Sequence, residues 1–222
     1  QLFARFEKTY TINYNLDSNS GFAASVPTTY NRAMDTIMLA EPQKVNHLFF
    51  GWYTNMTYTN EVVSINNENY LELSNPYFII NLYPKFLQRY EIIYNLYSGE
   101  NSPLNPSFYT EESNITLQPA EKEGYYFKGW YTNADATLGR LVTAINSSDP
   151  AFRTRYTLHA IFLPITYVNY VSNGGENPAG NPTWFTSEHN YGATLLDAVR
   201  TGYDFMGWYA TSNFTTDRIT TL

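Results

Sequence analysis

The side chains best suited to chemistry in this chain are three histidines. His47, His159 and His189 stand in three different parts of the chain, at positions that do not correspond to one another. Histidine serves as a general base or a metal ligand only where several groups converge on one site. The spacing of these three gives no reason for them to meet. We therefore expect ordinary surface or strand histidines, without a catalytic set or a metal site.

Acidic residues are the second candidate. Two pairs, Glu111-Glu112 and Glu121 with Glu123, could supply the acid and base of glycoside hydrolysis. The other parts of the chain lack equivalent pairs, so we expect these glutamates to lie on a solvated face. The stretch Asp17–Gly21 begins like a calcium loop and lacks the later bidentate glutamate. No serine-hydrolase, zinc-protease or phosphate-loop motif occurs. The sequence predicts neither an enzyme nor a cofactor.

Composition narrows the class of protein further. The chain has no cysteine, which excludes a disulfide scaffold, a cysteine-ligated zinc and a thiol nucleophile. A net charge of −7 with only 13 Lys and Arg weighs against a nucleic-acid partner. No apolar run approaches the roughly 20 residues of a membrane helix, so no membrane insertion is expected. A surface rich in Asn, Thr, Tyr and Ser is typical of secreted and cell-surface β proteins.

A repeat organises these residues. Gly-Trp-Tyr occurs three times, with the tryptophans at 52, 130 and 208, 78 residues apart. A leucine 12 residues before each glycine and a basic residue 7 before it recur as well. A fixed period with recurring flanks indicates repeated folding units. The predicted boundaries are a closing strand of a preceding repeat plus linker at 1–9, then repeats at 10–89, 90–165 and 166–222, the third incomplete.

Alternating apolar residues predict the strands of each repeat. Residues 10–16, 90–96 and 166–172 alternate as first strands, and residues 2–6, 82–86 and 158–162 as closing strands with leucine and phenylalanine on one face. Pro84 lacks a ladder donor, so its strand is expected at an edge or with the nitrogen facing outward. Asn46 replaces Gly124 and Gly202, which predicts positive φ there. The glycine before each tryptophan predicts a bulge or close backbone approach.

The aromatic residues of the repeat admit two interpretations. They could form a stacking platform for carbohydrate, or they could form the core of each repeat. A constant offset and strict alternation favour the core for Trp52, Trp130, Trp208, Phe49, Phe127 and Phe205. Trp184, beside Phe185, and Tyr191 are the candidates for facing a ligand, although partial burial of Trp184 against the sheet is the favoured interpretation.

These motifs resemble the Listeria–Bacteroides repeat, found as B repeats in internalins and in large bacterial surface proteins. The pattern is a Tyr-x-Ile-x-Tyr-x-Leu strand, a basic residue two before Gly-Tyr-x-Phe-x-Gly-Trp-Tyr, and a Leu-Tyr-Ala-x-Phe-like closing strand. The resemblance implies a mostly β fold, α+β at most, of β-grasp (ubiquitin- or SUMO-like) modules in tandem on an extracellular, cell-surface or wall-associated protein. Asn46-His47, Tyr83-Pro84 and Ala210-Thr211 depart from the pattern.

Three functional hypotheses follow. Linkers of three residues span only about 10 Å, so we expect a non-enzymatic, semi-rigid spacer or adhesion segment with an unidentified protein or cell-surface partner. The alternative is a carbohydrate-binding accessory segment of a larger secreted enzyme. A third is oligomerisation, in which residues 2–6 complete the open third repeat of a neighbour by strand addition.

Overall fold

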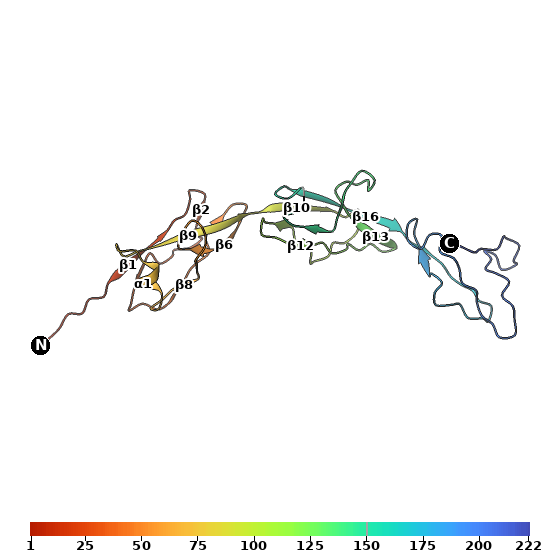
Figure 1. The fold of residues 1–222 in the computed structure, drawn as a ribbon, viewed down its shortest axis with the longest axis horizontal. Helices are drawn as coiled ribbons and strands as arrows, with labels where there is room; N and C mark the ends of the chain where they lie inside the picture. The colour runs from red at the N-terminus through yellow and green to blue at the C-terminus, as the bar shows by residue number, and fades with distance from the viewer. Residues whose placement is uncertain (150) are drawn as a thin grey trace. The chain divides into compact units, whose positions relative to one another are not determined.

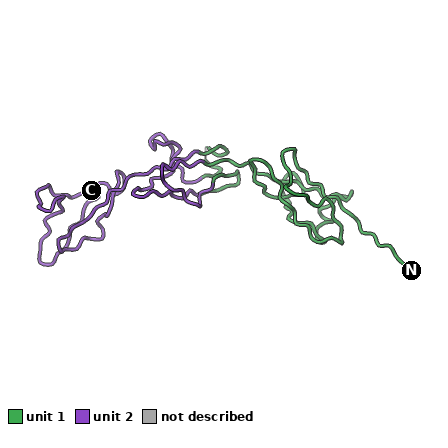
Figure 2. Tube along the Cα trace, turned by 180° about the vertical axis from the view of Figure 1, so that it is seen from behind, with its two compact units in different colours: residues 1–92, 107–115, 145–156 green, residues 93–106, 116–144, 157–222 purple. Residues whose placement is uncertain are grey.

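The computed structural model describes residues 1–149 and 151–222. The chain divides into two compact units, shown in Figure 2. The first comprises residues 1–92, 107–115 and 145–156, and the second residues 93–106, 116–144 and 157–222. Among the described residues, the only α-helix is α1, Tyr70–Leu73. The expectation of a mostly β protein is therefore confirmed (Figure 1).

A five-stranded mixed sheet forms the centre of the first unit. Its order is β3 (Thr29–Asn31), β1 (Thr9–Tyr14), β9 (Ile79–Gln88), β6 (His47–Tyr53) and β7 (Glu61–Val62). The closing strand β9 thus lies between the first strand and the Gly-Trp strand, parallel to β1 and antiparallel to β6 (Figure 1). Strands β6 and β7 are neighbours both in the sequence and in the sheet, whereas β9, the last of the five in sequence order, joins β1 to β6.

Alternation along the strands builds the core of this unit. In β1, Tyr10 and Ile12 are buried and the residues between them are exposed. In β9, Ile80 and Leu82 are 0% exposed. Period-2 alternation places these side chains on one face of the sheet. They pack with buried residues of the neighbouring strands and ribbons: Tyr30, Ile37, Trp52, Val62 and Ile65.

Two short antiparallel ribbons accompany this sheet. One pairs β2 (Ser20–Gly21) with β5 (Gln43–Lys44), and the other pairs β4 (Ile37–Met38) with β8 (Ser64–Ile65). Each ribbon joins segments distant in sequence. The β4–β8 ribbon contributes Ile37 and Ile65 to the core, so the apolar stretch before residue 66 is a strand.

A second five-stranded sheet repeats this order. It runs β11 (Phe108–Tyr109), β10 (Tyr90–Asn95), β16 (Tyr156–Pro164), β13 (Tyr125–Tyr131) and β14 (Leu141–Val142). A ribbon of β12 (Ile115–Thr116) and β15 (Ala144–Ile145) accompanies it. In the closing strand β16, Leu158 is 0% and Ala160 2% exposed. The same apolar pattern therefore fills the same place in both sheets.

The described residues after β16 have little regular structure. After β17 (Thr166–Tyr167) and its partner β18 (Trp184–Phe185), isolated bridges hold the chain, such as those between Trp208 and Ile219 and between Thr194 and Thr221. The described residues after 164 include no strand equivalent to β9 or β16. The boundaries of the three repeats stay a prediction.

The β-grasp assignment also stays a prediction. A β-grasp module has a helix packed on its sheet, whereas the described segment between β3 and β6 contains only the short strands β4 and β5. The four-residue helix α1 lies instead just before the closing strand β9. The loop chemistry of the segment explains this, because residues 17–46 include Gly21, Pro27 and Pro42, which interrupt a continuous helix.

Three backbone expectations can be compared with the structure. Asn46, Gly124 and Gly202 have φ of 57°, 75° and 82°, so asparagine stands where the other repeats have glycine at positive φ, as predicted. The register of β6 shifts between Phe49 and Gly51, which is the predicted bulge. The register of β13 shifts in the same way between Phe127 and Gly129.

Pro84 lies in strand β9, which pairs with two strands, but only one of them is paired with β9 at the proline itself. Residues 79–82 of β9 pair with β1, and residues 83–88 pair with β6. Strand β1 ends at Tyr14, opposite Leu82. Pro84 therefore follows the end of the parallel ladder, where a missing N–H costs no ladder hydrogen bond on that side.

Candidate functional site

The three histidines lie in separate environments. The His47 ring Nδ1 is 2.8 Å from the carbonyl oxygen of Val45. The His159 ring is hydrogen-bonded to the Tyr97 hydroxyl. His189 stacks on Trp184 with ring centroids 4.8 Å apart. Within the described residues, no three His, Cys, Asp or Glu side chains gather in a way that could hold a metal ion.

Both members of the first acidic pair form ion pairs with basic residues. Glu111 accepts from Arg153 at 2.9 Å, and Glu112 accepts from Lys85 at 3.1 Å. Glu121 uses its backbone in a β-bridge with Glu100. Each member of the first pair is thus engaged by a different basic residue, which gives the two carboxylates separate structural partners.

Each tryptophan of the Gly-Trp motif makes the same backbone contact. The indole Nε1 of Trp52 donates to the carbonyl oxygen of Ala40 at 2.9 Å. Trp130 donates to Gln118 at 2.8 Å, and Trp208 donates to Leu196 at 2.9 Å. In all three repeats the acceptor lies 12 residues earlier. The ring is therefore fixed in the fold by its polar edge, which leaves only its apolar surface for packing.

A tyrosine of each first strand makes a second recurring contact. The hydroxyls of Tyr14, Tyr94 and Tyr170 donate to the carbonyl oxygens of Pro27, Pro106 and Pro182, at 3.0, 3.0 and 2.9 Å. Burial raises the pKa of each tyrosine, that of Tyr94 to about 12. Desolvation disfavours the phenolate, so the neutral donor persists well into the alkaline range.

The basic residue before each Gly-Trp motif anchors the turn after the first strand. Lys44 binds the Asp17 carboxylate at 2.7 Å, and this hydrogen bond, together with those from Ser20 and the Asn19 N–H, lowers the pKa of Asp17 to about 2. Lys122 donates to the carbonyl oxygen of Tyr97 at 2.8 Å. Arg200 donates to that of Asn173 at 2.9 Å. The recurrence of a cation at this position thus has a structural cause.

Two buried asparagines form a clamp that the sequence analysis does not identify. The Asn105 side chain donates to the carbonyl oxygen of Gln118 at 2.9 Å and accepts from the Gln118 N–H at 2.7 Å. Asn181 does the same with Leu196, at 3.0 and 2.6 Å. Both asparagines stand directly before a proline at equivalent positions of the second and third repeats, and this recurrence could have identified them from the sequence. The first repeat has Val26 at that position, so the pattern is not shared by all three repeats.

The six predicted core aromatics are buried to different degrees. Trp52 and Trp130 are each 2% exposed, whereas Trp208 and the three phenylalanines are half-buried. In each repeat the phenylalanine ring packs on the tryptophan, with centroids 5.6, 5.4 and 5.3 Å apart. The members of this set are Phe49, Phe127 and Phe205 with Trp52, Trp130 and Trp208.

The two candidate ligand-facing residues lie in different settings. Trp184 is half-buried and contacts the rings of His189 and Tyr126, with centroids 4.8 and 5.8 Å away, and these two rings also stack on each other. Tyr191 is 69% exposed. Only Tyr191 therefore offers a largely free ring.

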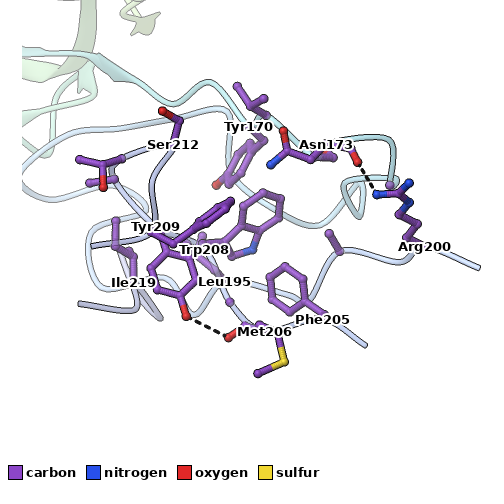
Figure 3. A pocket seen from close by; sticks show the side chains of 18 of the residues that line it. Tyr170, Asn173, Leu195, Arg200, Phe205, Met206, Trp208, Tyr209, Ser212 and Ile219 are labelled. Atoms are coloured by element: carbon purple, nitrogen blue, oxygen red, sulfur yellow. Dashed lines mark hydrogen bonds between the residues drawn. The ribbon is translucent and has the colours of Figure 1, made fainter. Parts of the chain in front are cut away.

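One cavity lies in the third repeat. It has a volume of about 750 Å³ and is lined by Tyr170, Leu195, Phe205, Trp208 and Ile219, among others. Figure 3 shows the rings of Tyr170, Trp208 and Phe205 gathered along it, with the Arg200–Asn173 hydrogen bond at one side. No carboxylate pair or histidine lines it. Its lining is mostly apolar and aromatic, and it includes one cation, Arg200, and one carboxylate, Asp204.

Comparisons with known proteins agree with this architecture. The model of the Listeria-Bacteroides repeat domain matches residues 10–71, 90–160 and 167–221. A protein of Evansella cellulosilytica named "Putative Gly-rich membrane protein" is 27% identical over 220 residues. The match covers 94% of this chain and 22% of that protein, so the chain spans less than a quarter of its length. No solved structure matches.

The described residues contain no helix that is long and apolar enough to span a bilayer. The family model covers most of the chain, in three successive regions that each contain one Gly-Trp motif. The hydrogen bonds of Trp52, Trp130 and Trp208 show one scaffold in these regions. The chain belongs to the Listeria-Bacteroides repeat family.

Proposed function

We propose that this chain is a non-enzymatic, extracellular repeat array of a bacterial cell-surface protein, acting as a semi-rigid spacer or adhesion segment. The observation that carries the proposal is the recurrence of one internal scaffold. The tyrosine–proline and tryptophan–carbonyl hydrogen bonds occur in all three repeats. The positions that recur thus serve the fold, as expected of modules that bear load or set distance.

Short connections between strands support the semi-rigid character. Strand β9 ends at Gln88 and β10 begins at Tyr90, so Arg89 alone separates them. Strand β16 ends at Pro164 and β17 begins at Thr166. A single residue spans at most about 3.6 Å. The expected three-residue linkers are therefore largely absorbed into strands, which leaves little freedom for a flexible joint.

An ion pair beside each of these connections adds to this argument. Lys85 on β9 binds Glu112 at 3.1 Å, and Lys128 on β13 binds Glu188 at 2.6 Å. Both glutamates lie three residues after the aromatic residue that ends the second strand, Tyr109 or Phe185. The acceptor position therefore recurs from one repeat to the next.

The lysine of the ion pair lies on a different strand in each of the two repeats. Lys85 is on the closing strand, and its ammonium lies over the ring of Phe50 on the Gly-Trp strand. In the second repeat Lys128 occupies the position of Phe50, and Ile161 occupies that of Lys85. Each repeat thus has one lysine and one apolar residue at this place. The preserved pairing with glutamate supports a contact that holds successive repeats.

Small-angle X-ray scattering of the chain tests the semi-rigid spacer. The variant carries a flexible Gly-Ser insertion after Arg89, and the matched control carries the same insertion in the exposed loop at residues 55–59. We expect the first insertion to broaden the distance distribution and the control to leave it nearly unchanged. Equal curves for all three proteins would contradict a stiff connection, because an already flexible joint gains nothing from extra residues.

Surface location needs a test in cells. An antibody against the chain should label intact bacteria that produce the full-length protein, and externally added protease should abolish the label. Replacing the chain by a Gly-Ser segment of equal length should reduce adhesion or the reach of neighbouring domains. Labelling only after lysis would refute the extracellular proposal.

The carbohydrate-binding alternative depends on exposed aromatic rings. Tyr191 offers one, being 69% exposed, whereas one face of Trp184 is covered by His189. A glycan array distinguishes the hypotheses. Binding by the native chain that is lost on Tyr191→Ala and kept on Tyr77→Ala, a control at an exposed tyrosine, would favour the alternative over the spacer.

A further inference from the structure

The chain passes through the first repeat by way of two neighbouring strands. It enters β1 at Thr9 and leaves β9 at Gln88, and Arg89 alone separates β9 from the first strand of the next repeat. Strands β1 and β9 lie side by side and run parallel (Figure 1). A pull along the chain acts on opposite ends of this pair, so it draws the two strands past each other along their common direction.

A continuous hydrogen-bonded ladder opposes this movement. Four residue pairs join the strands, from Thr11 opposite Ile79 to Tyr14 opposite Leu82. The Asn15 N–H extends the ladder by donating to the Leu82 carbonyl oxygen at 2.8 Å. Sliding one strand along the other displaces every donor from its acceptor at once, whereas separating the strands from one end breaks the bonds one after another.

Asparagine side chains reinforce the ladder on its polar face. Asn13 Nδ2 donates to Oδ1 of Asn81, the residue directly opposite, at 2.9 Å. Asn15 Nδ2 donates to the Leu82 carbonyl oxygen at 3.2 Å, the same oxygen that accepts from the Asn15 backbone. Ile93 stands in the place of Asn13 in the second repeat, which therefore lacks the asparagine pair.

The opposite face of the two strands is apolar and closed to water. Ile12 and Ile80 lie opposite each other and are 3% and 0% exposed, and Leu82 is 0% exposed. A hydrogen bond is electrostatically stronger beside a low-dielectric core than in water. The ladder is thus supported by the core on one face and by the asparagine pair on the other.

The outer strands of the sheet hold each of the two strands in place. Strand β1 pairs with β3 on its other side, and residues 83–88 of β9 pair with β6. Loops within the repeat connect β3 and β6 to the rest of the chain, so a pull along the chain does not load them directly. Each loaded strand must also slide past its outer neighbour, which adds to the resistance.

We propose that residues 11–14 of β1 and 79–82 of β9 form a tension-bearing pair, which keeps the first repeat folded when the chain is pulled along its length. The inference rests on the proposed function, because tension arises where the array connects an anchored domain to one that holds a partner. Forced unfolding is governed by the unfolding rate, and that rate is lowest when the whole ladder must break in one step. The repeat therefore transmits force at constant length.

Single-molecule force spectroscopy of the full chain tests the tension-bearing pair by changing the direction of the pull. The chain has no cysteine, so handles attach only at introduced thiols. Handles at Lys8→Cys and Arg89→Cys load opposite ends of the pair. Handles at Lys8→Cys and Tyr77→Cys load the same end, since Thr11 lies opposite Ile79. We expect an unfolding force at least about twofold higher in the first geometry, because four pairs then break together.

The variant Asn13→Ala tests the side-chain reinforcement, with Asn19→Ala, exposed in the turn after β1, as the matched control. Asn13 is exposed as well, so circular dichroism should show both variants folded. At constant force in the first geometry, Asn13→Ala should shorten the lifetime of the folded repeat roughly fivefold, the effect of losing one hydrogen bond. The control should keep the native lifetime.

Equal unfolding forces in the two geometries would overturn the tension-bearing pair. An Asn13→Ala lifetime equal to that of the control would remove the asparagines from it. Neither failure coincides with failure of the spacer, because the scattering experiment reports the joint at Arg89. A flexible joint there leaves the unfolding force of the first repeat unchanged.

Discussion

The hydroxyl of Tyr94 donates to the backbone carbonyl oxygen of Pro106 at 3.0 Å. This contact joins the first strand of the second repeat to the loop before its second strand, and Tyr14 and Tyr170 make the same contact in the other repeats. The hydroxyl lies in a partly buried site, and desolvation raises the pKa of Tyr94 to about 12. One hydrogen bond thus connects the geometry of the repeat to its response to pH.

Alkaline solution should weaken the second repeat. Below about pH 10 both folded and unfolded Tyr94 are protonated, and the contribution to stability is complete. Between about pH 10 and pH 12 the unfolded chain ionises while the folded one does not, so the free energy of unfolding falls as pH rises. Denaturant titrations over this range, comparing the native chain with Tyr94→Phe, measure the effect. Parallel pH profiles for the two proteins would contradict it.

Trp130→Ala should destabilise the second repeat by about 3–5 kcal/mol, the usual cost of removing a large buried aromatic. The side chain is 2% exposed and its indole N–H is bonded to Gln118, so both packing and a hydrogen bond are lost. Thermal melts followed by near-UV circular dichroism measure this, with Tyr77→Ala as an exposed control. Unchanged stability together with lost ligand binding would instead show a binding role for the ring.

Asn105→Ala should cost about 1–3 kcal/mol, because it leaves the Gln118 N–H without its acceptor and removes one of the donors to the Gln118 carbonyl oxygen, which keeps the indole of Trp130. Both the N–H and the carbonyl of Gln118 bond to this side chain. Asn114→Ala, at an exposed position, is the control and should be nearly neutral. Hydrogen exchange offers a second readout, since the Gln118 amide should lose protection in the first variant only. Full protection of that amide in Asn105→Ala would disprove the clamp.

Gly129→Ala should destabilise the bulge of β13. At φ of 152° a Cβ atom would lie 2.6 Å from Leu141 Cδ1, and the backbone conformation itself is strained for an alanine. Such strain costs on the order of 1–3 kcal/mol. Gly21→Ala is a matched control, because no heavy atom lies within 4 Å of the added methyl. Urea titration compares the two, and equal midpoints would refute the close approach.

The Lys85–Glu112 pair should contribute little in magnitude and depend on salt. Their side chains are 22% and 52% exposed, and exposed ion pairs contribute about 0.2–1 kcal/mol. A double-mutant cycle with Lys85→Met and Glu112→Gln measures the coupling energy, which should shrink at high ionic strength. A coupling that salt leaves untouched would indicate that the contact is not an exposed ion pair.

The strands could be predicted from the sequence, because the alternation of apolar and polar residues indicates which face of a strand is buried. Tyr10 and Ile12 are buried at alternate positions of β1, and Leu158 and Ala160 do the same in β16. The glycine-to-asparagine exchange at position 46 indicated its positive φ, because few other residues adopt that conformation. The absence of a recurring acid, base or nucleophile set gave the expectation of a non-enzymatic chain.

Contacts between distant segments could not be predicted in this way. Asn105 pairs with Gln118 and Trp130 bonds to the same residue, yet local alternation carries no information on which segments lie beside each other. Lys85 on β9 and Lys128 on β13 lie at the same place in their repeats. The sequence does not predict this, because the residues that face each other across neighbouring strands are far apart in the chain.

The sequence by itself determined the number of repeats, the strand faces and the aromatic set, because period and side-chain type are local properties. The tertiary structure alone decided that the closing strand lies between the first and the Gly-Trp strands, and that Phe86 of the closing strand pairs with Phe49 of the Gly-Trp strand. It also decided that Tyr170 and Trp208 line one cavity in the third repeat. The physical reason is that a sheet is completed by backbone pairing across long sequence distances.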